Sequence, residues 1–213
     1  MQSPANGHPL PAVFLDRDGV INDEVGHLTK PDQLILLPGS ASAINRLNNS
    51  GLPVIVVTNQ SVIGRGWCVE ADMDQVHDAL SGLLAEEGAH ITQFRYCPHH
   101  PTEAIGENLV DCDCRKPKPG MLRQAAQEIG LDLAASVMVG DRINDVIAGR
   151  EAGCRTVLVS TGLGMGERKL LATAPCQPDH LCDDLGSAVD WILAHRPTAP
   201  DMEPAIERST RPT

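Results

Sequence analysis

The sequence predicts an α/β fold in which helices cover a doubly wound parallel sheet. Short apolar runs recur along the chain, and segments with helical spacing separate them. The runs 13–15, 53–57 and 136–139 are apolar almost throughout, which is typical of parallel strands buried on both faces. Strands that alternate with helices form a parallel sheet, and ligands of such sheets bind at the carboxyl ends of the strands.

The composition is that of an ordinary globular protein. The chain has 213 residues, of which 42% are hydrophobic and 21% charged, enough for one domain with a sizeable core. We expect a single domain over residues 11–195, with a disordered N-terminus over 1–10 and a disordered tail over 196–213.

Targeting and charge narrow the choice of partners. No apolar run approaches the ~20 residues of a membrane helix, and the first residues lack the basic start and apolar centre of a signal peptide. We therefore expect a cytoplasmic protein that does not bind membranes. We also expect a monomer. The net charge of -11 argues against nucleic acid as a partner, because phosphate backbones bind basic surfaces. Phosphate chemistry remains open, since a few local cations at a site outweigh a distant acidic surface.

The first strand is followed by a loop and a short helix. Residues 21–38 have no clear periodicity and are punctuated by prolines, which favours a loop. Residues 40–49 carry apolar side chains at helical spacing, with Ser40 as the candidate N-cap and Gly51 as the C-terminal stop.

A second β-branched run, 53–60, predicts another buried strand that ends in small polar groups. We expect a loop over 61–67 and a helix over 69–87. The apolar stripe of this helix is expected to face the core rather than a partner, and it comprises Met73, Val76, Leu80, Leu83 and Leu84.

The second half of the chain continues the alternation of strands and helices. Glycines end two of the helical segments, at Gly130 and Gly153. We expect strands at 91–97, 136–141 and 155–160 and helices at 120–129, 144–152 and 185–195.

Two carboxylates one residue apart follow the first strand. Because side chains alternate along a strand, Asp16 and Asp18 can point the same way, one as a nucleophile or metal ligand and the other as a proton donor. The residues alone leave an equal alternative, a strand that ends in a solvated turn, since Asp-x-Asp-Gly is a common turn composition.

Further strand ends add complementary groups. The candidate residues at these ends and in adjacent loops are Asp16, Asp18, Thr58, Asn59, Arg115, Lys116, Asp141 and Asp145. They combine an acidic metal site, a hydroxyl–amide pair and two cations, which is the set needed to bind Mg²⁺ and to transfer a phosphoryl group to a carboxylate. In this order, over residues 12–162, they resemble the four motifs of the haloacid dehalogenase superfamily of phosphatases.

The resemblance implies a Rossmann-like fold and a role for each residue. Asp16 is the implied nucleophile, which forms an aspartyl-phosphate, and Asp18 is the general acid and base. Mg²⁺ is held by Asp16, Asp141 and the backbone carbonyl of Asp18. The residues implied to bind substrate phosphate are Thr58, Asn59, Arg115 and Lys116. Arg142 departs from the family pattern, in which lysine is usual after the last acidic motif, and is a further candidate for a contact to substrate phosphate. Asp145 is expected to support the metal or Lys116. Taken singly, Thr58 could be an ordinary strand cap and Lys116 a surface lysine.

A cysteine-rich segment forms a second constellation. Three of the seven cysteines lie near two histidines, and these residues are Cys97, His99, His100, Cys112 and Cys114. Three thiolates and one imidazole complete a tetrahedral Zn²⁺ shell, so we expect a structural zinc. Resemblance to the family selects His99 over His100. A buried thiol cluster without metal is the alternative.

The zinc segment also narrows the family. Residues 97–101 and 112–121 resemble the heptose bisphosphate phosphatases, which implies removal of the 7-phosphate of a heptose 1,7-bisphosphate in ADP-heptose and lipopolysaccharide precursor synthesis. Histidinol-phosphate phosphatases share the Asp-Arg-Asp-Gly start but typically have a shorter zinc loop, so histidinol phosphate is the alternative substrate. A catalytically silent zinc-binding interaction protein is the alternative of another class.

The spacing between motifs leaves no room for a folded cap domain. We therefore expect an open site, walled by the zinc loop and by segments 22–30 and 61–67. His27 and Arg65 are candidates for contacts to the sugar or a distal phosphate, although lone loop residues of this kind are often only solvated.

Overall fold

The computed structural model of the chain describes residues 9–196. The predicted disordered ends fall mostly outside this range. At its edges, Leu10 pairs with Leu131, and the side chain of Arg196 donates a hydrogen bond to the carbonyl of Ser50 at 2.7 Å. The folded part thus extends one residue beyond each predicted boundary. Among residues 9–196, none of the helices has both the length and the apolar character needed to span a membrane.

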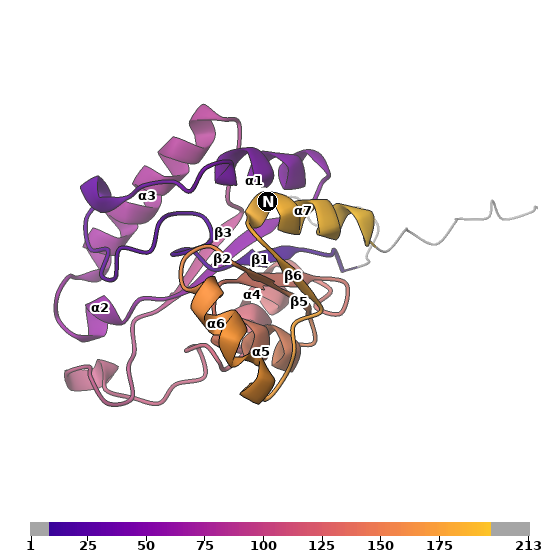
Figure 1. The fold of residues 1–213 in the computed structure, drawn as a ribbon. Coiled ribbons are helices and arrows are strands. Elements are labelled where there is room, and N and C mark those ends of the chain that lie inside the picture. The colour runs from indigo at the N-terminus through magenta and orange to yellow at the C-terminus, as the bar shows by residue number, and fades with distance from the viewer. Residues whose placement is uncertain (1–8, 197–213) are drawn as a thin grey trace, which may run out of the picture.

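Six parallel strands form one sheet in the order β3-β2-β1-β4-β5-β6 (Figure 1). The strands are β1 (Val13–Leu15), β2 (Val54–Asn59), β3 (Gln93–Cys97), β4 (Val137–Gly140), β5 (Arg155–Val159) and β6 (His180–Cys182). The register sets Leu15 beside Val56 on one side and Val139 on the other. The predicted parallel α/β sheet is confirmed. The edge strand β6 was not predicted, because it has three residues and its Leu181 is exposed.

Seven α-helices lie in the described range: α1 (Ser40–Asn49), α2 (Ser61–Gly64), α3 (Glu70–Glu86), α4 (Gly120–Ile129), α5 (Ile143–Ala152), α6 (Gly164–Leu170) and α7 (Leu185–Ala194). Short 3-10 helices occur at η1 (Pro31–Gln33), η2 (Gly106–Asn108) and η3 (Leu171–Thr173). Two expectations were wrong. The loop predicted over 61–67 contains the single turn α2, and Ser40 is the first helical residue, because the N-cap is Gly39 in the left-handed region at φ 77°.

Helices cover both faces of the sheet, as Figure 1 shows, with α1, α3 and α7 above it and α4, α5 and α6 below it in this view. The alternation of side chains along β1 explains the two layers. Val13 and Leu15 belong to the core under α1, α3 and α7, whereas Phe14 packs on the opposite side with residues of α4 and α5. The predicted stripe of α3 is buried at Met73, Val76, Leu80 and Leu84 and partly buried at Leu83.

The strand order positions the site. The chain runs from β1 outward to β2 and β3, and then returns to β4 on the other side of β1. Connections that leave neighbouring strands in opposite directions open a crevice at the carboxyl ends of those strands. Asp16 follows β1 and Asp141 follows β4, so both carboxylates lie at this crevice. In the described part of the chain, no separate folded unit is inserted over it, as expected for a capless member of the fold.

Candidate functional site

One pocket at the carboxyl edge collects most of the predicted site residues. Its lining includes Asp16, Asp18, His27, Thr58, Asn59, Arg65, Arg115, Lys116, Arg142 and Asp145. Asp141 does not line the pocket, because it is completely buried; its carboxylate lies within 4.8 Å of those of Asp16 and Asp145. Residues separated by more than a hundred positions in the sequence therefore share one cavity.

Lys116 lies between two carboxylates. Its Nζ atom is 2.9 Å from Asp16 Oδ2 and 2.6 Å from Asp145 Oδ1. Burial alone would lower the pKa of Lys116, but the charges of Asp145 and Asp16 outweigh it and raise that pKa. The second oxygen of Asp145 accepts a hydrogen bond from the backbone amide of Arg142 at 3.0 Å. Asp145 thus fixes the ammonium group beside Asp16.

Asp141 has one oxygen without a protein partner. Its Oδ2 atom accepts a hydrogen bond from the amide of Leu163 at 2.8 Å, while its buried Oδ1 atom has no hydrogen-bond partner. Burial, together with the charges of Asp16 and Asp145, raises the pKa of Asp141 to about 8. Such an oxygen, in a group of carboxylates whose ligand atoms lie within 4.8 Å of one another, fits a hard divalent cation such as Mg²⁺.

Gly19 allows the first strand to approach this acid. Its φ of +80° lies in the left-handed region, and a Cβ atom there would come within 2.3 Å of Asp141 Oδ2. A larger residue would both strain the backbone and displace the carboxylate. The glycine after the acidic pair is therefore required by the position of Asp141.

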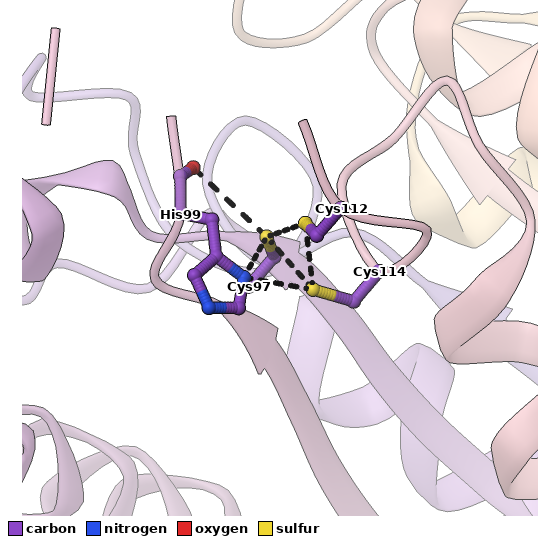
Figure 2. A group of neighbouring side chains, drawn as sticks. All are labelled: Cys97, His99, Cys112 and Cys114. Atoms are coloured by element: carbon purple, nitrogen blue, oxygen red, sulfur yellow. Dashed lines mark hydrogen bonds between the residues drawn. The ribbon is translucent and has the colours of Figure 1, made fainter. Parts of the chain in front are cut away.

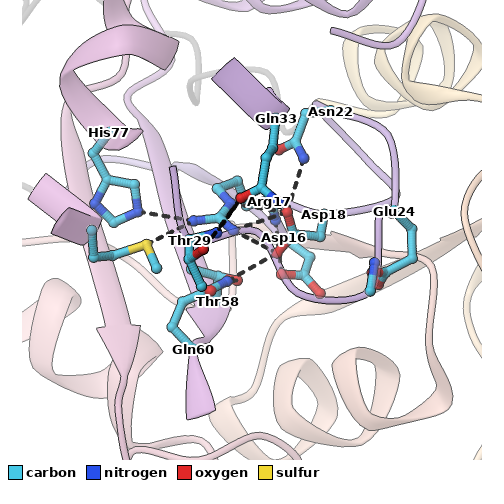
Figure 3. Close-up of polar contacts among 12 residues, drawn as sticks. Asp16, Arg17, Asp18, Asn22, Glu24, Thr29, Gln33, Thr58, Gln60 and His77 are labelled. Carbon is cyan, nitrogen blue, oxygen red and sulfur yellow. Dashed lines mark hydrogen bonds and ion pairs between the residues drawn. The ribbon is translucent and has the colours of Figure 1, made fainter. Parts of the chain in front are cut away.

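Asp18 is held by several donors (Figure 3). Arg17 donates from Nη2 to both carboxylate oxygens, at 2.9 and 2.8 Å, and from Nε at 3.1 Å. Asn22 and Gln60 add side-chain hydrogen bonds of 2.8 and 2.9 Å. Burial would raise the pKa of Asp18, but the charge of Arg17 and these hydrogen bonds lower it overall. In this conformation Asp18 is an anionic acceptor rather than an acid ready to donate.

The guanidinium group of Arg17 also contacts two side chains of α3. Its Nη1 atom lies 3.0 Å from Met73 Sδ and 3.4 Å from His77 Nε2. The ring of His77 stacks on Phe94 with centroids 4.6 Å apart, and burial and the charge of Arg17 lower the pKa of His77 to about 4. The imidazole is therefore neutral near pH 7 and can accept from the guanidinium.

Sequence reasoning missed Arg17, Asn22, Gln60 and His77. One signal was available: Gln60 is two residues after Thr58, so strand alternation sets both side chains on one side. Gln60 Nε2 indeed donates to Thr58 Oγ1 at 2.9 Å. The local sequence does not distinguish an arginine that is buried between two acidic residues from one that is exposed to solvent.

The side chain of Asn59 is committed to the loop that carries Lys116. Its Nδ2 atom donates to the carbonyl of Lys116 at 2.9 Å, and its Oδ1 atom accepts from the amide of Lys116 at 3.0 Å. This pair of bonds fixes the backbone of Lys116 to the end of β2. The predicted role of Asn59, through its backbone amide, stays a prediction.

Four ligand-type side chains converge after β3 (Figure 2). The sulfur atoms of Cys97, Cys112 and Cys114 lie 3.0–3.4 Å apart, and His99 Nδ1 lies 3.2 Å from the sulfur of Cys114. Hydrogen bonds from Cys97 in particular lower the pKa of Cys114 to about 5. Tetrahedral zinc spaces its sulfur ligands by about 3.8 Å, so a small outward movement of the three sulfur atoms would fit the metal.

The geometry distinguishes the two histidines. His100 Nδ1 accepts from the backbone amides of Thr102 and Glu103, at 3.3 and 3.0 Å, and so faces away from the sulfur atoms. Arg115 is connected to the group, because its Nη1 atom donates to the carbonyl of His99 at 3.0 Å. The cluster thus holds the segment that delivers Arg115 and Lys116 to the pocket.

Further charged residues surround the mouth of the pocket. Arg142 Nη2 lies 3.2 Å from Glu24 Oε2, and Arg65 pairs with Glu103. His27 lies against Trp67 with ring centroids 4.5 Å apart. His27, Arg65 and Arg142 share the pocket lining with the carboxylates Asp16, Asp18 and Asp145.

A family model and several known proteins that are similar to this chain indicate the same family. Residues 113–188 match the HAD-hydrolase-like family model. The D-glycero-beta-D-manno-heptose-1,7-bisphosphate 7-phosphatase of Pasteurella multocida is 45% identical over 152 residues, covering 71% of this chain and 82% of the relative. The enzyme of that name from Pseudomonas aeruginosa is also 45% identical, over 182 residues, covering 85% and 97% of the two chains.

A solved structure that is similar to this chain belongs to the same family as these relatives. The crystal structure of D,D-heptose 1.7-bisphosphate phosphatase from B. bronchiseptica, complexed with magnesium and phosphate, has a TM-score of 0.77 and 37% identity. The match covers 87% of this chain and 99% of that one. The chain therefore belongs to the heptose-1,7-bisphosphate 7-phosphatase family of the haloacid dehalogenase superfamily.

Proposed function

We propose that this chain is a Mg²⁺-dependent phosphatase that removes the 7-phosphate of D-glycero-D-manno-heptose 1,7-bisphosphate. The observation that carries the proposal is the pairing of Asp16 with Lys116 beside the partnerless oxygen of Asp141. Relatives at 45% identity bear the name of this activity, and a solved relative contains magnesium and phosphate.

Asp16 is the proposed nucleophile. One of its carboxylate oxygens attacks phosphorus, the bond between phosphorus and the C7 oxygen breaks, and an aspartyl-phosphate forms. Lys116 neutralises Asp16 in the free protein and then the charge on the transferring group. Water attacks the phosphorus of the aspartyl-phosphate in the second step, which releases inorganic phosphate and restores Asp16.

Asp18 is the proposed general acid and base. It gives a proton to the C7 oxygen as that oxygen leaves, and later takes one from the attacking water. Because Arg17 stabilises the anionic form of Asp18, the carboxyl group must turn from Arg17 toward the substrate to act as an acid. Arg17 would then favour the return of the ionised carboxylate.

Mg²⁺ fits the remaining oxygens. We assign it to Asp16, Asp141 and the backbone carbonyl of Asp18, where it would stabilise charge on the phosphoryl oxygens. Asp145 is better suited to a supporting role, since both of its oxygens already have protein partners.

Several groups are proposed to bind the substrate. The hydroxyl of Thr58 and the backbone amide of Asn59 face the phosphoryl group, and the guanidinium groups of Arg115 and Arg142 contact substrate phosphate. Cys97, His99, Cys112 and Cys114 are proposed to bind one structural Zn²⁺, because three thiolates and an imidazole leave no open ligand position.

The test is phosphate release with Mg²⁺ from heptose 1,7-bisphosphate and from histidinol phosphate. We expect a higher kcat/KM for the heptose, and a preference for histidinol phosphate would overturn the assignment. Asp16→Asn should abolish release without unfolding the chain, whereas Asp183→Asn, whose side chain is 91% exposed, serves as the matched control. Normal turnover by Asp16→Asn would exclude the aspartyl-phosphate route.

A further inference from the structure

One wall of the pocket is organised around Trp67. The indole is 51% exposed and lies just outside the pocket lining. His27 meets it edge-on, with an interplanar angle of 74°, and the guanidinium carbon of Arg65 lies 5.1 Å from its ring centroid. His27 and Arg65 both line the pocket. A single exposed ring thus contacts two polar residues that reach the substrate cavity from different loops.

These contacts restrict side chains that would otherwise be mobile. An edge-to-face aromatic pair and a cation–π contact each favour one orientation of the side chains that form them. His27 is exposed and belongs to the loop between β1 and α1, where a free imidazole would sample several rotamers. Trp67 therefore pre-arranges His27 and Arg65 before a ligand arrives, which reduces the entropy lost on binding.

The distribution of charge around the pocket indicates what kind of ligand Arg65 and His27 bind. In the free protein, Lys116 pairs with Asp16 and Asp145 beside the proposed nucleophile, and Arg142 pairs with Glu24. Arg65 and Arg115 both line the same pocket. Two guanidinium groups that line one pocket form a site for a multiply charged anion.

The acidic partner of Arg65 occupies an exposed position. Glu103 belongs to the segment between β3 and α4, and its side chain is 52% exposed. Exposed ion pairs contribute little to stability, so a phosphate group can replace this carboxylate at little cost. Arg65 is therefore available to a ligand that enters the pocket.

We infer that Trp67 is a positioning residue for the phosphate of the substrate that is not transferred. Trp67 holds Arg65 and His27 at the mouth of the pocket, where they bind the C1 phosphate while the C7 phosphate reaches Asp16. This inference rests on the proposed function and adds a determinant of selectivity for bisphosphates over monophosphates. Trp67 itself contacts no reacting atom.

The kinetic test compares heptose 1,7-bisphosphate with heptose 7-phosphate, which lacks the C1 phosphate. Trp67→Ala should lower the ratio of the two kcat/KM values at least tenfold, through a higher KM for the bisphosphate. Ile105→Ala is the matched control, because Ile105 is a 64% exposed apolar residue near Gly66. An unchanged ratio in Trp67→Ala, or an equal fall for both substrates, would overturn the inference.

A binding test needs no turnover. The sequence contains two tryptophans, and the second, Trp191, lies on α7 against Arg155. In the Asp16→Asn, Trp191→Phe protein, the emission of Trp67 should respond to the bisphosphate at tenfold lower concentration than to heptose 7-phosphate. Adding Arg65→Gln should remove this difference. Equal responses to both ligands before that change would contradict the inference.

The two proposals fail in different ways. If the unaltered protein releases no phosphate from either heptose, the proposed function is wrong whatever Trp67 does. If it cleaves the bisphosphate and Trp67→Ala retains the same selectivity, only the role of Trp67 is wrong.

Discussion

The fully buried guanidinium of Arg17 binds the carboxylate of Asp18, the next residue in the chain, at 2.8, 2.9 and 3.1 Å. A buried arginine cannot lose its proton, so its charge stabilises the ionised form of Asp18. The group expected to donate a proton is thus kept ionised in the free protein. The pair connects the proposed general acid to the hydrophobic core, because Arg17 contacts Met73 and His77.

Removal of the Arg17 charge should move the pH profile. In Arg17→Gln the pKa of Asp18 should rise, because the opposing effect of burial remains while the cation is lost. The limb of the kcat/KM profile that reports Asp18 should therefore shift to higher pH. Arg17→Lys keeps a charge and should shift the limb less. A loss of activity without any shift would indicate that Arg17 is only structural.

Loss of the Asn59 side chain should weaken catalysis without disturbing the cysteine cluster. Asn59→Ala removes both hydrogen bonds to the backbone of Lys116, and kcat/KM should fall roughly tenfold to a hundredfold, or about 1.5–3 kcal/mol. The matched control is Asn45→Ala, whose amide donates to the exposed carbonyl of Glu87 at 2.9 Å. Equal effects of the two changes would refute a specific role for the Asn59 contact.

Cys112→Ala should reduce bound zinc to less than one ion per chain, because three ligands remain. Elemental analysis of the purified protein measures this content. The loop should also loosen around Arg115, which bonds to the carbonyl of His99, so KM should rise. Cys176→Ala provides a partly buried thiol outside the cluster as control. Full zinc occupancy in Cys112→Ala would remove Cys112 from the ligand set.

His77 should make stability depend on pH. Its folded-state pKa of about 4 lies below the ordinary 6.5, so the unfolded chain binds more protons between these values. Stability therefore rises with pH through this window and is lost as pH falls toward 4. The shift corresponds to a contribution on the order of 3 kcal/mol. Urea unfolding at neutral pH and near pH 5 should show a smaller difference in His77→Gln than in the unaltered protein. Equal differences would exclude His77 as the cause.

The sheet could be predicted because buried parallel strands are apolar at every position. The runs in β1, β2 and β4 have this property, and all three were placed correctly. The strand β6 and the helix α6 lack a comparable pattern, since both lie near the edge and expose residues such as Leu181 and Met165. Short elements of this kind are stabilised by neighbours that the local sequence does not reveal.

The site could be predicted where its residues follow strands. The positions of Asp16, Thr58 and Asp141 follow from the rule that carboxyl ends of parallel strands share one edge. The contact between Arg17 and His77 joins residues 60 positions apart, and its existence depends on how α3 packs over the sheet. Trp67 was likewise invisible to pattern reasoning, because a lone aromatic residue in a loop carries no periodicity.

Asp16, directly after the central strand, and the residues that surround the mouth of the pocket lie in parts of the fold that tolerate substitution differently. The amide of Asp16 donates a hydrogen bond to the carbonyl of Val139 at 3.0 Å, at the end of a fully buried strand. Trp67, His27 and Glu103 lie on surface loops, where substitutions cost little stability. Descendants of this protein can therefore acquire a preference for another phosphorylated sugar while inheriting the same chemical machinery.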